Sequence, residues 1–228
     1  MAAPPAGPRL AMVYNNIMPG ILRLEEGRES AVAEACAKAL SGGAVAIVPT
    51  DTVYGVAASV RVPRAVKRVY AVKGRDAAKP LVVMTASVEE AVALAVPRER
   101  ESVRRLASFW PGALTVVVEA VELPWREVVA PGSRTLGIRV PDCPFLLEVL
   151  SLAGPLAVTS ANPSGGEAPG AGEEIDASLL QRVDLVVEGG RTGTGKPSTV
   201  AEVGEGRIRV LRRGDISEED LLAALAGR

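Results

Sequence analysis

Short apolar segments rich in Val, Ile and Leu alternate along nearly the whole chain with segments whose apolar residues recur at helical spacing. Segments of the first kind are typical of buried strands, and segments of the second kind are typical of helices that cover a sheet. No internal repeat and no break in composition divides the 228 residues. The alternation therefore predicts one α/β domain with a mixed β-sheet.

Local patterns give the expected elements. Helices are predicted at Arg28–Leu40, Pro63–Val72, Ser87–Ala95, Arg98–Phe109, Asp142–Leu150 and from Ser217 onward. Strands are predicted at Ala44–Val48, Leu81–Met84, Leu114–Glu119, Leu136–Val140, Leu156–Thr159 and Leu185–Val187, followed by a hairpin of Thr199–Val203 and Arg207–Leu211. Residues 1–19 are rich in Ala and Pro and are predicted to be a flexible N-terminal segment, so the domain is expected to span 20–228.

Three polar residues are expected to begin helices. Ser87 opens a capping box, Ser217 caps the last helix, and Asp142 is expected to cap the helix that follows it. The apolar residues expected on the inner side of the last helix are Leu221, Leu222 and Leu225.

The chain has no histidine, which excludes Ser-His-Asp and Cys-His catalysis and zinc sites that contain His. Its two cysteines, Cys36 and Cys143, are far apart and form no C-x-x-C pair. Neither a thiolate zinc site nor a disulfide framework is predicted, and no metal ligand is assigned. The two thiols are expected to pack as small apolar groups in a reducing compartment.

The charge and composition of the chain limit the partners and the cellular location that we expect. The chain has 26 basic and 27 acidic residues, a net charge of −1, and only 3% aromatic residues. This composition disfavours a nucleic-acid surface built on a positive field and stacked rings. The first 16 residues lack the apolar core of a signal peptide, and no run of 18 apolar residues exists. We expect a soluble, cytoplasmic protein with no membrane contact.

Three polar loops lie beside predicted strands, where α/β domains tend to bind ligands. Pro49–Gly55 has three hydroxyl groups and a carboxylate, which suit a small polar ligand or a turn that bonds its own backbone. Lys73–Pro80 has three cations, which suit a polyphosphate or a solvated basic turn. Thr159–Gly166 combines Ser160 and Asn162 with glycines, which suits an anion or an ordinary turn.

A fourth segment, Gly190–Lys196, matches the G-x-x-x-x-G-K pattern of phosphate-binding loops. The next residue is Pro197 rather than the Ser or Thr that would bind magnesium, and Ser198–Val203 is β-like where a helix is required. A true P-loop is therefore not predicted. We expect a flexible glycine-rich loop that brings Arg191, Lys196 and Ser198 to the edge of a site.

Seven sequence blocks occur in the order found in YrdC-like threonylcarbamoyl-AMP synthases, and the chain resembles this family from about Gly20 to Ile216. The blocks are P-T-D-T-V-Y-G (Pro49–Gly55), K-G-R-x-x-x-K-P-L (Lys73–Leu81), F-W-P-G-x-L-T (Phe109–Thr115), G-I-R-V-P (Gly137–Pro141), S-A-N-P-S-G (Ser160–Gly165), P-S-T-V (Pro197–Val200) and L-R-R-G (Leu211–Gly214). The ordered set is far more specific than any single block. The resemblance implies a YrdC-like fold, in the short form without a further C-terminal domain. Such a fold has a twisted mixed sheet, flanking helices and a concave, positively lined cavity.

The resemblance also implies an activity. Members of this family are nucleotidyltransferases that form threonylcarbamoyl-adenylate and pyrophosphate from ATP, L-threonine and bicarbonate or CO2. A downstream tRNA threonylcarbamoyl-transferase complex then modifies the adenosine beside the anticodon. Mg²⁺ is expected with the ATP, held mainly by phosphate oxygens because no Asp/Glu cage is evident in the sequence.

Site residues follow from the matching blocks. The implied catalytic and phosphate-binding set is Lys73, Arg75, Ser160 and Asn162. Contacts with ATP are implied for Arg75, Lys79, Thr135, Asn162 and Arg212. Contacts with threonine are implied for Thr52, Arg139, Ser160 and Ser198, and Arg139 is suited to a bidentate pair with a carboxylate.

Two residues depart from the family pattern. Asp76 stands where proline is frequent and places a carboxylate next to Arg75 in sequence, and Met84 replaces a histidine near the threonine pocket. For Arg139, an ion pair with Asp142 on the surface of a strand is the alternative to a ligand contact.

Other functions remain open from the sequence. The chief alternative is a stand-alone YrdC-like paralogue that binds nucleotide or structured RNA and uses a different carbamoyl-type substrate. Weak RNA binding is a further possibility if the basic groups converge on one face.

Overall fold

The computed structural model describes residues 18–204 and 206–227. Its strands are β1 (Gly20–Arg23), β2 (Ala46–Val48), β3 (Gly55–Ser59), β4 (Val82–Met84), β5 (Leu114–Glu119), β6 (Thr135–Arg139), β7 (Leu156–Ser160), β8 (Leu185–Glu188), β9 (Thr199–Gly204) and β10 (Arg207–Arg212). Its α-helices are α1 (Glu29–Ser41), α2 (Pro63–Lys73), α3 (Val88–Leu94), α4 (Arg100–Leu106), α5 (Arg126–Val129), α6 (Pro144–Ala153), α7 (Ala177–Leu180) and α8 (Glu218–Leu225). Short 3-10 turns lie at Pro97–Glu99, Ala107–Phe109 and Gly172–Glu174.

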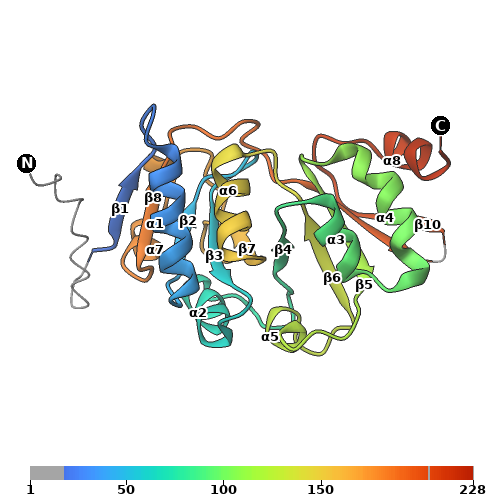
Figure 1. The fold of residues 1–228 in the computed structure, drawn as a ribbon, viewed down its shortest axis with the longest axis horizontal. Helices are drawn as coiled ribbons and strands as arrows, with labels where there is room; N and C mark the ends of the chain where they lie inside the picture. The colour runs from blue at the N-terminus through green and yellow to red at the C-terminus, as the bar shows by residue number, and fades with distance from the viewer. Residues whose placement is uncertain (1–17, 205, 228) are drawn as a thin grey trace, which may run out of the picture.

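All the described strands join one sheet in the order β1-β8-β2-β3-β7-β4-β6-β5-β9-β10 (Figure 1). The sheet contains parallel pairs, such as β4 with β6 and β5 with β9, and antiparallel pairs, such as β3 with β7. The prediction of a single α/β domain with a mixed sheet is confirmed. Of the predicted flexible segment 1–19, residues 1–17 lie outside the described residues.

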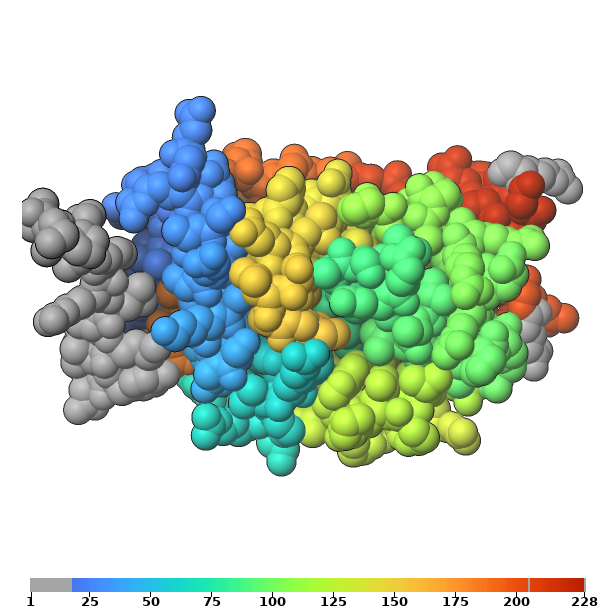
Figure 2. Space-filling view, viewed as in Figure 1, coloured from blue at the N-terminus to red at the C-terminus, as the bar shows by residue number. Residues whose placement is uncertain are grey.

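Helices cover the sheet through two apolar cores, because successive side chains of a strand point to opposite faces. Ile47 of β2 belongs to the larger core, which includes residues of α2, α3, α4 and α8. Its neighbours Ala46 and Val48 belong to the smaller core with α1 and α6. Figure 2 shows α1 and α6 side by side on one side of the molecule.

Two of the three expected helix starts are confirmed. The Ser87 hydroxyl accepts a hydrogen bond from the Glu90 amide, and the Ser217 hydroxyl accepts one from Asp220. The expected cap by Asp142 is wrong, because α6 begins at Pro144 with Cys143 in the N-cap position. Proline suits the first helical position, where its missing N–H would have no partner.

Other differences have local causes. Strand β3 was not predicted, since its sequence Gly-Val-Ala-Ala-Ser has only one β-branched residue, yet all five residues are buried between β2 and β7. The helix expected at 98–109 is shorter, with 3-10 turns on both sides of α4. In α8, Leu221 is fully buried, but Leu222 is 49% exposed and does not lie on the inner side.

Among the helices at 18–204 and 206–227, none combines the length and the apolar content of a membrane span.

Candidate active site

A cleft of about 130 Å³ lies over the middle of the sheet, and its floor comes from adjacent strands. The floor residues are Val158 of β7, Val82 and Met84 of β4, Arg139 of β6 and Thr115 of β5. The walls are formed by Thr50, Thr52–Gly55, Arg75, Pro80, Thr159, Ser160, Pro197, Ser198 and Arg212. Strand order thus gathers the polar loops noted in the sequence around one hollow.

Lys73, the last residue of α2, joins two of these loops. Its side chain is buried, and its Nζ donates to the Ser160 carbonyl at 2.5 Å and to the Ser160 hydroxyl at 3.2 Å. It also donates to Thr159 Oγ1 at 3.3 Å and to Asn162 Oδ1 at 3.4 Å. Lys73, Ser160 and Asn162, distant in sequence, therefore form one cluster.

The Asn162 amide fixes the loop on its side of this cluster. Its Nδ2 donates to the Pro163 carbonyl at 2.8 Å and to the Gly166 carbonyl at 2.7 Å, which leaves Oδ1 directed to Lys73. The Ser164 amide in turn donates to the Lys73 carbonyl at 3.1 Å. The loop after β7 and the end of α2 are thereby held as one unit.

Burial and, to a smaller extent, the positive charge of nearby Arg75 lower the pKa of Lys73 to about 8. All four oxygens that Lys73 contacts belong to neutral groups. A partly desolvated cation without a carboxylate is stabilised by binding an anion.

Arg75 lies beyond the end of α2. Gly74 has the left-handed φ of +59° that ends the helix. Arg75 Nε donates to the Lys79 carbonyl at 2.9 Å, and its Nη2 donates to the Pro80 carbonyl at 3.0 Å. Burial lowers the pKa of Arg75. These bonds hold the guanidinium against its own loop, at the wall of the cleft.

The Asp76 carboxylate bonds within its own turn and not to Arg75. Asp76 Oδ1 accepts a hydrogen bond from the Ala78 amide at 2.9 Å, within the same turn. Lys79 is exposed at the end of this turn, and its amide donates to the Asp76 carbonyl. The Asp76 carboxylate therefore stabilises its own turn.

Arg212 and Ser198 form the opposite wall. Arg212 Nε and Nη2 donate to the Ser198 carbonyl at 3.1 and 2.9 Å, and Nη2 also reaches the Ser198 hydroxyl at 3.2 Å. The Ser198 and Thr115 hydroxyls are 2.9 Å apart. Burial lowers the pKa of Arg212, and the charges of Arg139 and Arg75 lower it further. The charges of the other two guanidinium groups therefore act on Arg212.

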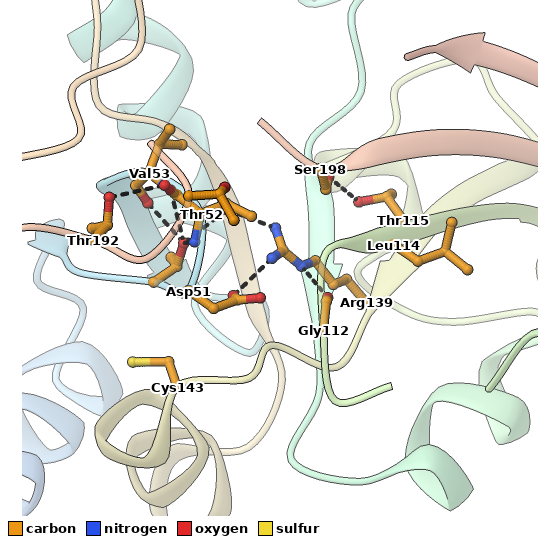
Figure 3. Close-up of polar contacts among 12 residues, drawn as sticks. Asp51, Thr52, Val53, Gly112, Leu114, Thr115, Arg139, Cys143, Thr192 and Ser198 are labelled. Carbon is orange, nitrogen blue, oxygen red and sulfur yellow. Dashed lines mark hydrogen bonds and ion pairs between the residues drawn. The ribbon is translucent and has the colours of Figure 1, made fainter. Parts of the chain in front are cut away.

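Arg139 is anchored at all three guanidinium nitrogens (Figure 3). Nε donates to the Gly112 carbonyl at 3.0 Å, Nη1 to Thr52 Oγ1 at 3.0 Å, and Nη2 to Asp51 Oδ1 at 2.7 Å. The alternative pairing with Asp142 is wrong, because the partner is Asp51 and the side chain is buried. Burial lowers the pKa of Arg139, and Asp51 opposes this effect.

Thr135 lies apart from this group. It shares a face of β6 with Arg139 but begins the strand, and it lines a separate hollow with Glu119 and Glu202. Its hydroxyl is 3.0 Å from the Ser133 hydroxyl.

The glycine-rich segment Gly190–Lys196 leads into a strand, β9, which agrees with rejecting a P-loop. Only part of the expectation for its side chains holds. Ser198 lines the cleft, but Arg191 pairs with Glu174 and Lys196 pairs with Asp215. Thr192 anchors the segment by donating to the Thr52 and Gly170 carbonyls.

The sequence did not assign Asp51, Thr115 or Tyr54 to the site. Tyr54 lines the cleft, and its hydroxyl donates to the Gly190 carbonyl and accepts from the Gly189 amide. The family blocks contain all three residues, which was the available signal, but their partners come from distant segments.

Comparisons with known proteins bear on the family and the fold of the chain. A Sua5/YciO/YrdC family model, described as telomere recombination, matches residues 38–214. The threonylcarbamoyl-AMP synthase of Bacillus subtilis is 35% identical over 79% of this chain and 53% of its own length. A putative threonylcarbamoyl-AMP synthase of Methanocaldococcus jannaschii is 34% identical over 88% of this chain and 94% of its own.

A solved structure shares the fold. The crystal structure of Pyrococcus abyssi Sua5 complexed with L-threonine has a TM-score of 0.81 and 32% identity, over 90% of this chain and 60% of that one. The chain spans about half the length of the Bacillus subtilis relative. Since the family model covers most of the chain and the structural match extends over nearly all of it, the chain belongs to the Sua5/YciO/YrdC family.

Proposed function

We propose that this protein is a threonylcarbamoyl-AMP synthase, which forms threonylcarbamoyl-adenylate and pyrophosphate from ATP, L-threonine and bicarbonate or CO2. Relatives named for this activity support the proposal, as does the threonine bound by the Pyrococcus abyssi structure. The single observation that carries it is the cleft with two unlike halves. One half is defined by cations that have no carboxylate partner among the described residues, namely Arg75 and Arg212 on opposite walls, with Lys73 bonded to Ser160 of the lining. The other half is defined by Arg139, which is paired with Asp51 and bonded to Thr52.

The first half suits a triphosphate. Phosphoryl chemistry depends on positioning and on neutralising charge at the α-phosphate and the leaving group. Lys73, with Ser160 and Asn162, is proposed to bind phosphate oxygens, and Arg75 and Arg212 to stabilise the departing pyrophosphate. Lys79 is proposed to contact the nucleotide from the rim, and Thr135 to contact it farther along β6.

The second half suits an amino acid. Arg139 is proposed to bind the threonine carboxylate, and Thr52, Ser160 and Ser198 to contact the rest of the molecule. The threonine amine and CO2 or bicarbonate give a carbamate, whose oxygen attacks the α-phosphate and expels pyrophosphate. No protein nucleophile is needed, which suits a chain without histidine.

Mg²⁺ is proposed to enter with ATP as part of the substrate. The residues lining the cleft include no carboxylate, and the described part of the chain has no group of three metal-binding side chains. Phosphate oxygens and water are then its main ligands. The product is proposed to pass to a tRNA threonylcarbamoyl-transferase complex.

The test is pyrophosphate release by purified protein. We expect release to require ATP, threonine and bicarbonate together. Lys73→Ala should reduce it by about 100-fold or more, since loss of one hydrogen-bond donor that stabilises charge at a reacting centre costs roughly 2.7–4 kcal/mol. Lys67→Ala is the matched control, since Lys67 is an exposed lysine on the same helix. Release that does not depend on threonine, or equal loss in both variants, would contradict the proposal.

A further inference from the structure

Asp51 lies behind the cleft rather than in its lining. Its carboxylate contacts Arg139 Nη2 at 2.7 Å, and the two side chains are only 11% and 4% exposed. Arg139 and Thr52 line the cleft, whereas Asp51 is absent from the lining. In Figure 3, Asp51 and Gly112 lie on either side of the Arg139 guanidinium.

Two N–H groups of the Arg139 guanidinium are not used by the described residues of the protein and can bind a ligand. A guanidinium has five N–H groups, one on Nε and two on each terminal nitrogen. Gly112, Thr52 and Asp51 take one from each nitrogen. One N–H therefore remains on Nη1 and one on Nη2, the number that a bidentate carboxylate requires.

The glycine-rich segment Gly190–Lys196 holds Asp51 in place, independently of its ion pair with Arg139. Its carbonyl accepts a hydrogen bond from the Thr194 amide at 3.4 Å. Gly193 packs so closely that an added Cβ would lie 2.7 Å from the same carbonyl. The glycine-rich segment thus fixes Asp51, and Asp51 fixes Arg139.

Asp51 also makes the charge of the cleft uneven, because it neutralises one of the cations there. In the described part of the chain, Lys73, Arg75 and Arg212 have no carboxylate within ion-pair distance, whereas Arg139 has one. The cleft therefore has a strongly positive half and a half in which the cation is already balanced. A dianion such as phosphate gains more from the first half, and a monoanionic carboxylate is tolerated in the second.

We propose that Asp51 is a positioning and specificity residue for the amino-acid half of the cleft. It aligns the free N–H groups of Arg139 for a carboxylate, and it cancels the Arg139 charge so that phosphate groups do not compete there. This inference rests on the proposed function.

The test uses Asp51→Asn, which removes the charge but keeps the size and one acceptor oxygen. Threonine binding is titrated calorimetrically with the phosphate-binding half filled by a non-hydrolysable ATP analogue, and inorganic phosphate is then added as a competitor. We expect threonine to bind about tenfold more weakly or worse in the variant, since breaking a buried charge pair is strongly unfavourable. We expect phosphate to compete with threonine in the variant but not in the unchanged protein. The KM for threonine should rise while the KM for ATP stays the same.

Asp142→Asn is the matched control, because Asp142 is exposed and close in sequence to the end of β6. It should leave threonine binding unchanged. Equal threonine affinity in Asp51→Asn and the unchanged protein, with no phosphate competition, would overturn the inference while leaving the proposed function intact. Absence of threonine binding in the unchanged protein would instead overturn the proposed function.

Circular dichroism checks that Asp51→Asn is folded. If it is not, two other measurements decide. Asp51→Glu keeps the charge and should continue to exclude phosphate, and competition by phosphate in the unchanged protein would count against the inference.

Discussion

The fold strongly changes the acid–base chemistry of the Lys73 side chain. Its ammonium is surrounded by neutral oxygens of Thr159, Ser160 and Asn162. Burial, with a smaller contribution from the charge of Arg75, lowers its pKa from 10.5 to about 8. The charged form is therefore costly in the free protein and is favoured again when an anion binds beside it. The lysine should act as a phosphate ligand whose charge depends on pH near neutrality.

This dependence can be measured. As pH rises from 7 to 9, the fraction of ammonium in the free protein falls, so kcat/KM for ATP should decline with an apparent pKa near 8. The decline in kcat should lie at higher pH, because bound triphosphate raises the pKa of Lys73. Initial rates across this range provide the measurement.

The control is Lys73→Arg, whose side chain stays charged over this pH range. This variant should lose the decline near pH 8, even if its rate is lower. The same decline in that variant would assign the titration to another group.

The turn after β10 controls where Arg212 lies. The Thr199 hydroxyl accepts hydrogen bonds from the Gly214 and Ile216 amides and donates to the Ile216 carbonyl. A Cβ on Gly214 would lie 2.8 Å from the Pro197 carbonyl and closer still to the Thr199 amide nitrogen. Glycine at 214 is therefore required by the close approach of two backbone segments.

Gly214→Ala should lower the free energy of unfolding by about 1–3 kcal/mol, the usual cost of forcing extra volume into packed structure. Urea denaturation measures this change. Gly204→Ala is the control, since an added Cβ there meets nothing within 4 Å. Because the backbone must shift next to Ser198 and Arg212, the KM for ATP should also rise in the first variant only. An unaltered unfolding midpoint would show that the turn adapts.

The molecule as a whole brings together cations from α2, the segment before β4, and β10. Burial lowers the pKa of Lys73, Arg75 and Arg212, and the charge of Arg75 lowers the pKa of Lys73 and Arg212 further. An anion with several charges should relieve the repulsion between these cations and bind only to the folded state.

Pyrophosphate should therefore raise the melting temperature, with a stabilisation of about 2.7 kcal/mol at 100 times its Kd. The effect should weaken as NaCl is added, because salt screens charges near the surface. Thermal melts with and without pyrophosphate provide the test, with acetate as the monoanionic control. Lys73→Ala should melt at nearly the same temperature in both conditions. An equal shift for acetate would point to a general salt effect.

Local patterns in the sequence determined the types of most elements, because helix spacing, capping residues and β-branched runs act within a few residues. They also supplied the cations, hydroxyls and amides of the cleft, in loops such as Lys73–Pro80 and Thr159–Gly166. Local patterns did not predict the Gly/Ala-rich strand β3, because it is burial between β2 and β7 that makes this segment a strand.

Which residues meet was settled by the order of strands, and that order depends on hydrogen bonds between segments far apart in the chain. Neighbouring β7, β4 and β6 bring Ser160, which contacts Lys73, and Arg139 to the same cleft. The pairing of Arg139 with Asp51 rather than the nearby Asp142 has the same origin. A buried guanidinium takes the carboxylate that packing brings to it, and no short-range pattern encodes that contact.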